Sequence, residues 1–305
     1  MPLFIESPSK IYQGAEAAEK LQTTNDSRFV SDDGIIRVDD TRWQVAQEYE
    51  RVTWLVHGIN ITDDRADQHR DGFNQYHDLP QDLGHVLELG CGVFTITNTI
   101  LAGGRTAQSI TLVDPLADAY KNHPHCTYRD GNIQGTPVTI EGVAIEQLDL
   151  TPTQLFDTVI MVNVLSHCRD ARLVLDIAAR AVAPGGVIVF QETVHDFDPF
   201  DVWDAGHPLR FKQPFLDAFM SRFEAVYKGD ENYFVGRKPS LQQYAPAGYS
   251  KFTGKVVECI GDPPLHTEEI SPGVEITHVV SEEKDNIPAP AKQEKKPARK
   301  SKGSK

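Results

Sequence analysis

Short apolar runs alternate with amphipathic helical patterns along the middle of the chain. Four runs have the length and the β-branched content of buried strands: 85–89, 110–113, 158–162 and 186–190. Helical patterns fill the gaps between them: 94–102, 115–122 and 170–182. Strands that alternate with helices in this way predict a parallel sheet covered by helices on both faces.

Helices and strands are also predicted on either side of this region. Helical spacing recurs in three flanking segments: 41–57, 64–77 and 213–222. Two strand-like runs at 224–228 and 232–237 are joined by Gly229-Asp230, which predicts an antiparallel pair. The predicted fold class is therefore α/β. We expect a doubly wound, Rossmann-like sheet of seven strands, mostly parallel with an antiparallel last strand, and a helical N-terminal cap.

Composition divides the chain into five segments. They are an N-terminal extension (1–40), a helical cap or lid (41–80), the α/β domain (81–238), an appended small segment (239–283) and a basic tail (284–305). The tail is rich in Lys, Pro, Ala and Ser and holds one large apolar residue. It cannot bury enough surface to offset the entropy of ordering, so we expect it to be disordered.

The formal net charge of −14 is unevenly distributed. Residues 292–305 hold seven Lys or Arg and one Glu, whereas residues 1–291 hold 23 basic and 43 acidic side chains, a net charge of −20. A body this acidic repels phosphate backbones, which makes nucleic acid an unlikely partner for it. The basic tail is the part expected to contact an anionic partner.

Other compositional features limit the class of protein. No apolar run approaches the roughly 18 to 20 residues that a membrane span requires, and the start of the chain has no secretory pattern. The four cysteines have neither C-x-x-C nor disulfide-like spacing. We therefore expect a cytoplasmic protein without a structural metal site.

The most informative motif is V-L-E-L-G-C-G at 86–92, where a predicted strand runs into a glycine turn and a helix follows. Glycines allow close approach of a ligand to the backbone, and a helix N-terminus offers unpaired N–H groups. Asp114 ends the second strand, 22 residues after Gly92, where an acid can accept both hydroxyls of a ribose. Asp114 could instead only cap the next helix.

Together with F-D-T-V-I-M-V-N-V-L-S-H (156–167) and A-P-G-G-V-I-V-F (183–190), these motifs resemble those of class I S-adenosylmethionine (SAM)-dependent methyltransferases. Within that superfamily the chain is most similar to the type 11 small-molecule methyltransferase domains. The resemblance covers residues 81–238, and it implies SAM as cofactor and S-adenosylhomocysteine as product. It does not specify the methyl acceptor.

The resemblance also implies which residues bind SAM. Four residues of the first turn would hold its amino-acid end: Glu88, Gly90, Cys91 and Gly92. Asp114 would bind the ribose hydroxyls, with Pro115 beside the adenine. Relatives usually have an Asp where this chain has Ala144, so the adenine amino group would meet Glu146 or the backbone of Ile145. Asn163 would lie beside the transferable methyl group, followed by Leu165 toward the substrate.

Two positions depart from the usual pattern: Phe94 replaces the third glycine, and Ser166 stands where many relatives have an acid. SAM is an activated donor, so a general base is needed only when the acceptor must lose a proton. Three histidines are candidates for that base: His167, His195 and His207. His167 is the leading candidate because the motif fixes its position.

Two aromatic clusters are expected to shape the acceptor site. One lies at 197–203. The other is in the N-terminal helical part and either closes over SAM as a lid or is simply core: Trp43, Tyr49, Trp54, Phe73 and Tyr76. Arg65, His69 and Arg70 would give that lid a cationic edge, unless they form an ordinary solvated face.

The sequence thus predicts a methyltransferase that acts on an oxygen or nitrogen atom of a small molecule. A non-catalytic methyltransferase-like scaffold remains an alternative. A nucleic-acid methyltransferase is less favoured, because the motifs for base methylation do not follow the fourth strand. An NAD-dependent oxidoreductase is also less favoured, because Thr95 stands where G-x-G-x-x-G requires glycine. The oligomeric state is open.

Overall fold

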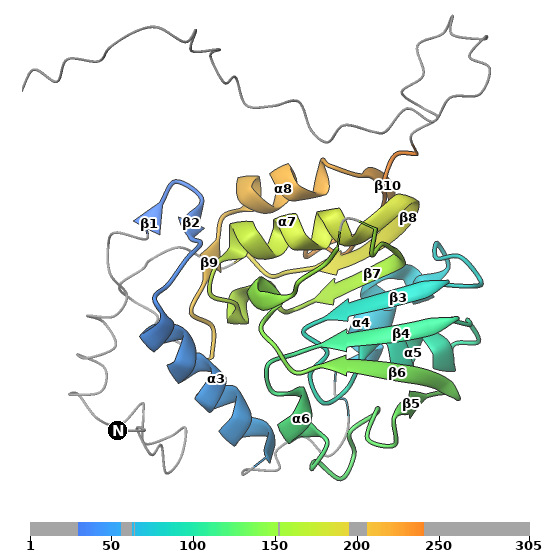
Figure 1. The fold of residues 1–305 in the computed structure, drawn as a ribbon. Coiled ribbons are helices and arrows are strands. Elements are labelled where there is room, and N and C mark those ends of the chain that lie inside the picture. The colour runs from blue at the N-terminus through green and yellow to red at the C-terminus, as the bar shows by residue number, and fades with distance from the viewer. Residues whose placement is uncertain (1–29, 56–62, 64, 152, 195–205, 241–305) are drawn as a thin grey trace, which may run out of the picture. The chain divides into compact units, whose positions relative to one another are not determined.

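The computed structural model describes residues 30–55, 63, 65–151, 153–194 and 206–240 (Figure 1). These residues all belong to the first of two units into which the chain divides, 1–248; the second is 249–305. His195, the 197–203 aromatic cluster, the appended segment and the basic tail lie outside the described residues.

The described part is built on an eight-stranded sheet with strand order β10-β11-β8-β7-β3-β4-β6-β5. The strands are β3 (His85–Leu89), β4 (Ser109–Val113), β5 (Asn132–Ile133), β6 (Thr136–Glu141), β7 (Phe156–Val162), β8 (Val182–Gln191), β10 (Glu224–Lys228) and β11 (Phe234–Arg237). The five strands from β8 to β6 are parallel. The pairs β11–β8, β10–β11 and β5–β6 are antiparallel. The predicted mixed, Rossmann-like sheet is confirmed.

The sheet has one strand more than the seven predicted. The additional strand is β5, which has two residues, too few to form a hydrophobic pattern. Its neighbour β6 was not located in the sequence either, because its residues alternate between half-buried and exposed and it contains Pro137. A half-exposed strand next to the edge of a sheet lacks the mostly apolar sequence of the central strands.

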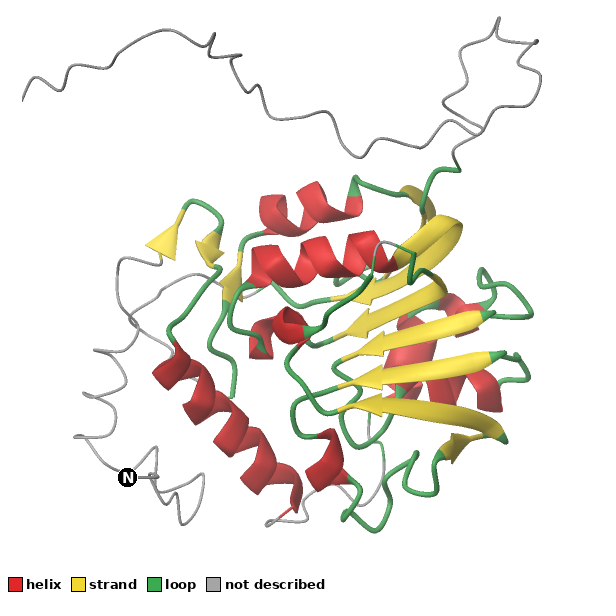
Figure 2. Ribbon diagram, in the orientation of Figure 1, coloured by secondary structure: helices red, strands yellow, loops and turns green. Residues whose placement is uncertain are grey.

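Helices cover both faces of the sheet (Figure 2). They are α4 (Ala66–Gly72) and α5 (Ile96–Ala102) on one face, and α7 (Ala171–Ala181) and α8 (Gln213–Met220) on the other (Figure 1). Alternate residues of a strand point to opposite faces. Accordingly, Val86 packs into the core under α4 and α5, whereas Leu87 packs into the core under α7 and α8. The short helix α6 (Ala117–Tyr120) follows β4.

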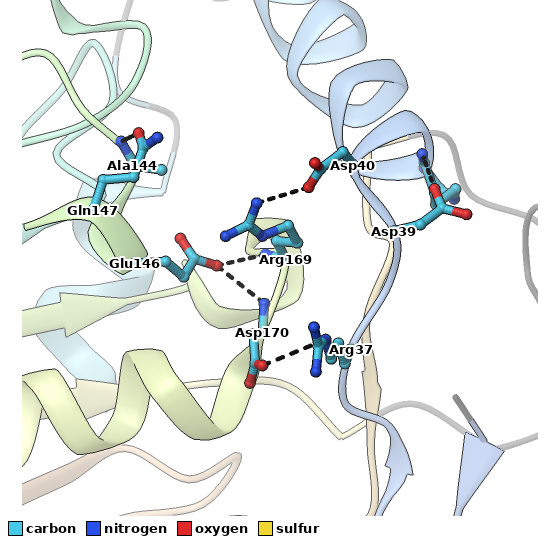
Figure 3. Close-up of polar contacts among 9 residues, drawn as sticks. Arg37, Asp39, Asp40, Ala144, Glu146, Gln147, Arg169 and Asp170 are labelled. Carbon is cyan, nitrogen blue, oxygen red and sulfur yellow. Dashed lines mark hydrogen bonds and ion pairs between the residues drawn. The ribbon is translucent and has the colours of Figure 1, made fainter. Parts of the chain in front are cut away.

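Helix α3 (Asp40–Leu55) lies beside the carboxyl ends of the parallel strands (Figure 1). It corresponds to the helix predicted over 41–57, of which residues 56 and 57 lie outside the described residues. Its N-terminal end is held to the loop between β7 and α7, where Arg169 Nη1 lies 2.7 Å from Asp40 Oδ1 (Figure 3). Just before α3, Arg37 lies 3.6 Å from Asp170 Oδ2 in the same loop. Both contacts involve exposed groups, so they fix orientation more than they stabilise the fold.

The second cap helix is shorter than predicted. A single helix was expected over 64–77, but α4 ends at Gly72 and a 3-10 turn, η2 (Asn74–Tyr76), follows. All three residues of η2 have positive φ, between 50° and 57°, a conformation that cannot continue a right-handed helix. Elsewhere, β1 (Val30–Ser31), β2 (Gly34–Ile35) and β9 (Arg210–Phe211) form a small antiparallel sheet.

Candidate cofactor and acceptor site

The two glycines of the turn after β3, Gly90 and Gly92, have different structural roles. Gly90 has φ +69°, and a Cβ placed there would fall 2.4 Å from Cγ1 of Val164, so only glycine fits. Gly92 has φ +56°, and a Cβ there would meet nothing within 4 Å. The backbone at Gly92 is therefore open to a ligand, whereas Gly90 allows the turn to pack on the loop after β7.

Glu88 is buried beneath this turn and binds the first turn of α5. Its carboxylate accepts hydrogen bonds from Ile96 N at 2.7 Å, Thr97 N at 3.0 Å and Thr97 Oγ1 at 2.5 Å. Burial raises the pKa of Glu88 to about 7, against the lowering effect of these hydrogen bonds. Glu88 therefore holds the helix N-terminus in place while it also lines the cavity described below.

Asp114 bridges the first two strand ends. Its Oδ2 accepts from Gly92 N at 3.1 Å and its Oδ1 accepts from Leu116 N at 2.8 Å. Desolvation raises the pKa of Asp114 to about 6, opposed by the same two hydrogen bonds. The two interpretations of Asp114 are thus compatible, because each carboxylate oxygen has a second lone pair with which to accept a ribose hydroxyl.

The turn expected to meet adenine is η3 (Ile145–Gln147). Glu146 Oε1 accepts from the backbone N–H groups of Arg169 at 2.8 Å and Asp170 at 3.0 Å (Figure 3). This oxygen of Glu146 therefore braces the loop that enters α7. Ile145 and Glu146 both line the cavity, so the predicted contact with adenine remains a prediction for both.

The loop after β7 brings Asn163 to the cavity but not Leu165. Asn163 has φ +54°, a left-handed conformation that Asn tolerates better than most residues, and its N–H donates to Gln191 O at 2.9 Å. Leu165 begins the 3-10 turn η4 (Leu165–His167), is fully buried, and is absent from the cavity lining. Its N–H donates to Glu192 Oε2 at 2.7 Å. Within the described residues, the structure thus places Leu165 in the core.

The cavity has a volume of about 330 Å3, within the usual range of small-molecule sites. Nine of the ten predicted SAM-binding residues line it: Glu88, Gly90, Cys91, Gly92, Asp114, Pro115, Ile145, Glu146 and Asn163. His167 and His207 line it too, with ring centroids 4.3 Å apart. His195 lies outside the described residues.

Residues 87–188 match a protein family described as a methyltransferase domain. Over these residues the chain contains a methyltransferase-like domain. The chain is 25% identical over 166 residues to a ubiquinone biosynthesis O-methyltransferase of Coxiella burnetii. The match covers 54% of this chain and 62% of that protein, so the chain spans about three fifths of the length of this curated relative.

Solved structures similar to the methyltransferase domain have low sequence identity. A SAM-dependent methyltransferase of Leishmania major is 18% identical, covers 64% of this chain and 81% of its own, and has a TM-score of 0.44. The 1,6-didemethyltoxoflavin-N1-methyltransferase of Burkholderia thailandensis is 16% identical, covers 67% of this chain and 92% of its own, and has a TM-score of 0.42.

The residues of the methyltransferase domain fit SAM. The open backbone at Gly92 leaves the space that a close ligand requires. Three acidic side chains of this domain line the cavity and suit a cofactor with a cationic sulfonium: Glu88, Asp114 and Glu146. Asp114 would hold the ribose, and the glycine turn would hold the amino-acid end.

The departures from the usual motifs have local explanations. Phe94, which replaces the third glycine, packs edge-on against Trp54 of α3, with the ring centroids 6.0 Å apart. The glycine turn therefore packs against the cap. Ser166 is buried, and its N–H donates to Glu192 Oε2 at 3.3 Å. The buried Glu192, at the end of β8, thus supplies a carboxylate beneath the loop where relatives often have an acid of their own.

The cap aromatics divide between lid and core. Trp43, Tyr49 and Trp54 line the cavity, whereas Phe73 and Tyr76 are buried in the core beside the sheet.

The three basic residues expected at the edge of the lid also lie in different places. Arg65 and His69 line the cavity. Arg70 instead pairs with Asp67 at 2.7 Å on the exposed surface of α4. Burial lowers the pKa of His69 to about 4, so this side chain is neutral at ordinary pH.

One site residue has no signal in the sequence motifs. Glu50, on α3, lines the cavity and lies 3.6 Å from His167 Nδ1 through its Oε1. Burial raises its pKa. From the sequence, a single acidic residue in an amphipathic helix is expected to face solvent. Glu50 reaches the cavity only because α3 packs against the edge of the sheet.

The structure also bears on metals and membranes. Within the described residues, no group of three or more His, Cys, Asp or Glu side chains is placed to hold a metal ion. Among the helices that the structure describes, none combines the length and the apolar character needed to cross a membrane.

Proposed function

We propose that this chain transfers a methyl group from SAM to an oxygen or nitrogen atom of a small molecule. The observation that carries the proposal is the convergence of the glycine turn, Asp114 and His167 on one cavity. The first two suit the cofactor, and His167 suits the removal of a proton from an acceptor. The C. burnetii relative is named for O-methylation, which supports the same chemistry.

When bound, SAM supplies an electrophilic methyl group on a sulfonium. The chain's own contribution is to hold the acceptor in line with that methyl group, exclude water and accept a proton. Asn163 lines the cavity at the end of β7, where it would face the reacting centre. His167 is the proposed base, with His207 beside it, and His195 remains a candidate in the part of the chain outside the described residues.

Binding of the cofactor is the first test. Isothermal titration with SAM and S-adenosylhomocysteine should show binding to the purified full chain, and Asp114→Ala should weaken it by about tenfold or more, the loss of a charge-assisted hydrogen bond. Asp118→Ala is the matched control, because Asp118 is an exposed acid on α6 that pairs with Lys121. No binding by the wild-type chain would refute the proposal.

Turnover is the second test, and it separates an enzyme from a scaffold. The full chain is incubated with methyl-labelled SAM and a protein-free extract of small metabolites. Labelled products should appear by mass spectrometry and be absent with the Asp114→Ala variant. Binding of SAM without any labelled product would favour a scaffold over an enzyme.

We also propose that the basic tail tethers the protein to an anionic partner and takes no part in catalysis. This follows from the separation of seven positive side chains from an acidic body. Deletion of 286–305 should leave SAM affinity unchanged, and a large loss would place the tail in the site. We propose a cytoplasmic location, supported by the buried and free thiols of Cys91, Cys126 and Cys168.

A further inference from the structure

We infer that Glu50 is a positioning residue for the methyl acceptor. It orients His167 as a general base and makes the site selective for a neutral acceptor that bears a hydroxyl group. This inference rests on the proposed function and narrows its acceptor to one chemical class.

The cluster is assembled from three separate segments. Glu50 comes from α3, His167 from η4, and Gly206 and His207 from the segment that leads to β9. His167 Nδ1 lies 2.9 Å from Gly206 O and 3.6 Å from Glu50 Oε1. A Cβ at Gly206 would fall 2.7 Å from Glu50 Oε1, so the absence of a side chain there lets the carboxylate approach.

Helix α3 holds His167 by a second contact. Gln47, one turn before Glu50, donates from Nε2 to the backbone oxygen of His167 at 3.2 Å. Residues three apart lie on one face of a helix, so a single face of α3 contacts both the backbone and the ring of His167. Trp54, one turn after Glu50, donates from Nε1 to Glu50 Oε2 at 3.1 Å and fixes the carboxylate.

The hydrogen bond to Gly206 determines the tautomer of the His167 ring. A carbonyl oxygen only accepts, so Nδ1 must carry the proton in the neutral ring. The lone pair is then on Nε2, the nitrogen that can take a proton from an acceptor. Once the ring is protonated, its positive charge lies beside the Glu50 carboxylate. Orientation of a histidine base by a carboxylate that does not itself transfer the proton is a general device of enzymes.

The charges around Glu50 discriminate between acceptor classes. Burial raises the pKa of Glu50; His207, the Trp54 hydrogen bond and Arg65 oppose this rise, and Asp114 adds to it. An anionic acceptor would meet the other acidic side chains that line the cavity, Asp63 and Asp114 among them. A cationic ammonium acceptor would meet Arg65, and the sulfonium when SAM is bound, and its nitrogen has no lone pair with which to attack the methyl group. A neutral hydroxyl avoids both costs.

In the proposed reaction, a methyl group is transferred to the hydroxyl oxygen of the acceptor. The acceptor hydroxyl gives its proton to His167 Nε2, and its oxygen forms a bond to the methyl carbon. Bound SAM would supply this methyl group, and its sulfur–carbon bond would break with the electron pair left on sulfur as a neutral thioether. The proton on His167 is released to solvent after the product leaves.

The first experiment needs no acceptor. Nitrogen-15 spectra of the histidine rings in the full chain report tautomer and titration, and His167→Gln assigns the His167 signals. The neutral ring should be protonated on Nδ1. Glu50→Gln, which keeps an oxygen for Trp54, should move the His167 titration to lower pH. Glu48→Gln is the control, since Glu48 pairs with Arg51 on the same helix and does not line the cavity. An unchanged titration in Glu50→Gln would overturn the inference.

The second experiment tests the acceptor class with para-substituted phenols, benzoates and benzylamines of similar size. Phenols should be methylated, and Glu50→Gln should lower kcat/KM by about tenfold or more. The acid limb of its pH profile should move to lower pH, with SAM affinity within about twofold of wild type, and Glu50→Asp should recover part of the rate. Preference for benzoates or benzylamines, or no phenol methylation by protein that binds SAM, would overturn the inference. Loss of SAM binding by the wild-type chain would instead refute the proposed function.

Discussion

Replacement of Glu88 by glutamine is expected to remove a large part of the pH dependence of folding. Burial raises the pKa of Glu88 from 4.5 to about 7. Between these two values the folded chain keeps a proton that the unfolded chain releases. The stability contributed by this group is therefore fully present below pH 4.5 and is lost as the pH rises through 7.

The size of the effect follows from the two pKa values. At 1.36 kcal/mol for each pH unit between them, Glu88 accounts for roughly 3 kcal/mol of the free energy of unfolding. Glutamine has no proton to release, so the variant lacks this slope. Asp114, whose pKa burial raises to about 6, gives a slope of the same sign. It is present in both chains and cancels from their difference.

The assay is urea unfolding followed by far-UV circular dichroism at pH 5, 6, 7 and 8. The wild-type chain should lose stability relative to Glu88→Gln by about 2.5 kcal/mol over this range, because part of the total effect is already lost at pH 5. Glu141→Gln is the control, because Glu141 is an exposed carboxylate on β6 of the same sheet. A difference between wild type and Glu88→Gln that stays constant from pH 5 to pH 8 would refute the reasoning.

Three further predictions concern the site and the core. Gly92→Ala should destabilise the fold by about 1 kcal/mol, and Gly90→Ala by several kcal/mol more, because only a Cβ at position 90 meets a valine side chain. Urea unfolding of both variants measures this difference. Affinity for SAM, measured by titration, should rise between pH 5 and pH 7 as Asp114 ionises, and this rise should be absent in Asp114→Asn. Thr158→Val should cost about 1 kcal/mol in urea unfolding, since it removes a 2.8 Å hydrogen bond to Leu83 O, and SAM affinity should not change.

The central part of the fold could be predicted because its signals are local. The strands β3, β4 and β7 are mostly apolar, and most of their residues are buried on both faces of the sheet, so each can be recognised as a strand without knowledge of its neighbours. The strands β5 and β6, at one end of the sheet, could not be found in this way. The position of β6 depends on its pairing with β4 and that of β5 on its pairing with β6, and half of β6 faces solvent.

The cavity-lining residues at the ends of β3 and β4 could be predicted for the same reason. Gly90 and Asp114 are required by backbone conformation and by strand ends, which leave a motif in the sequence. Leu165 belongs to the same motif, yet its side chain turns into the core because its backbone is bonded to Glu192. Glu50 belongs to no sequence motif, because it reaches the site only through the packing of a separate helix.

The residues proposed to face the acceptor and those proposed to bind the cofactor lie in separate segments of the chain. Every residue that α3 contributes to the cavity lies in one stretch of 16 residues, upstream of all the cofactor motifs. Exchange of that stretch would replace one wall of the acceptor site and leave the glycine turn and Asp114 untouched. Two contacts of α3 with the β7–α7 loop do not depend on Glu50: Asp40 pairs with Arg169, and Gln47 donates to the backbone oxygen of His167. A grafted helix that keeps Asp40 and Gln47 could therefore dock in the same place, so a related enzyme could change its acceptor while it keeps its methyl donor.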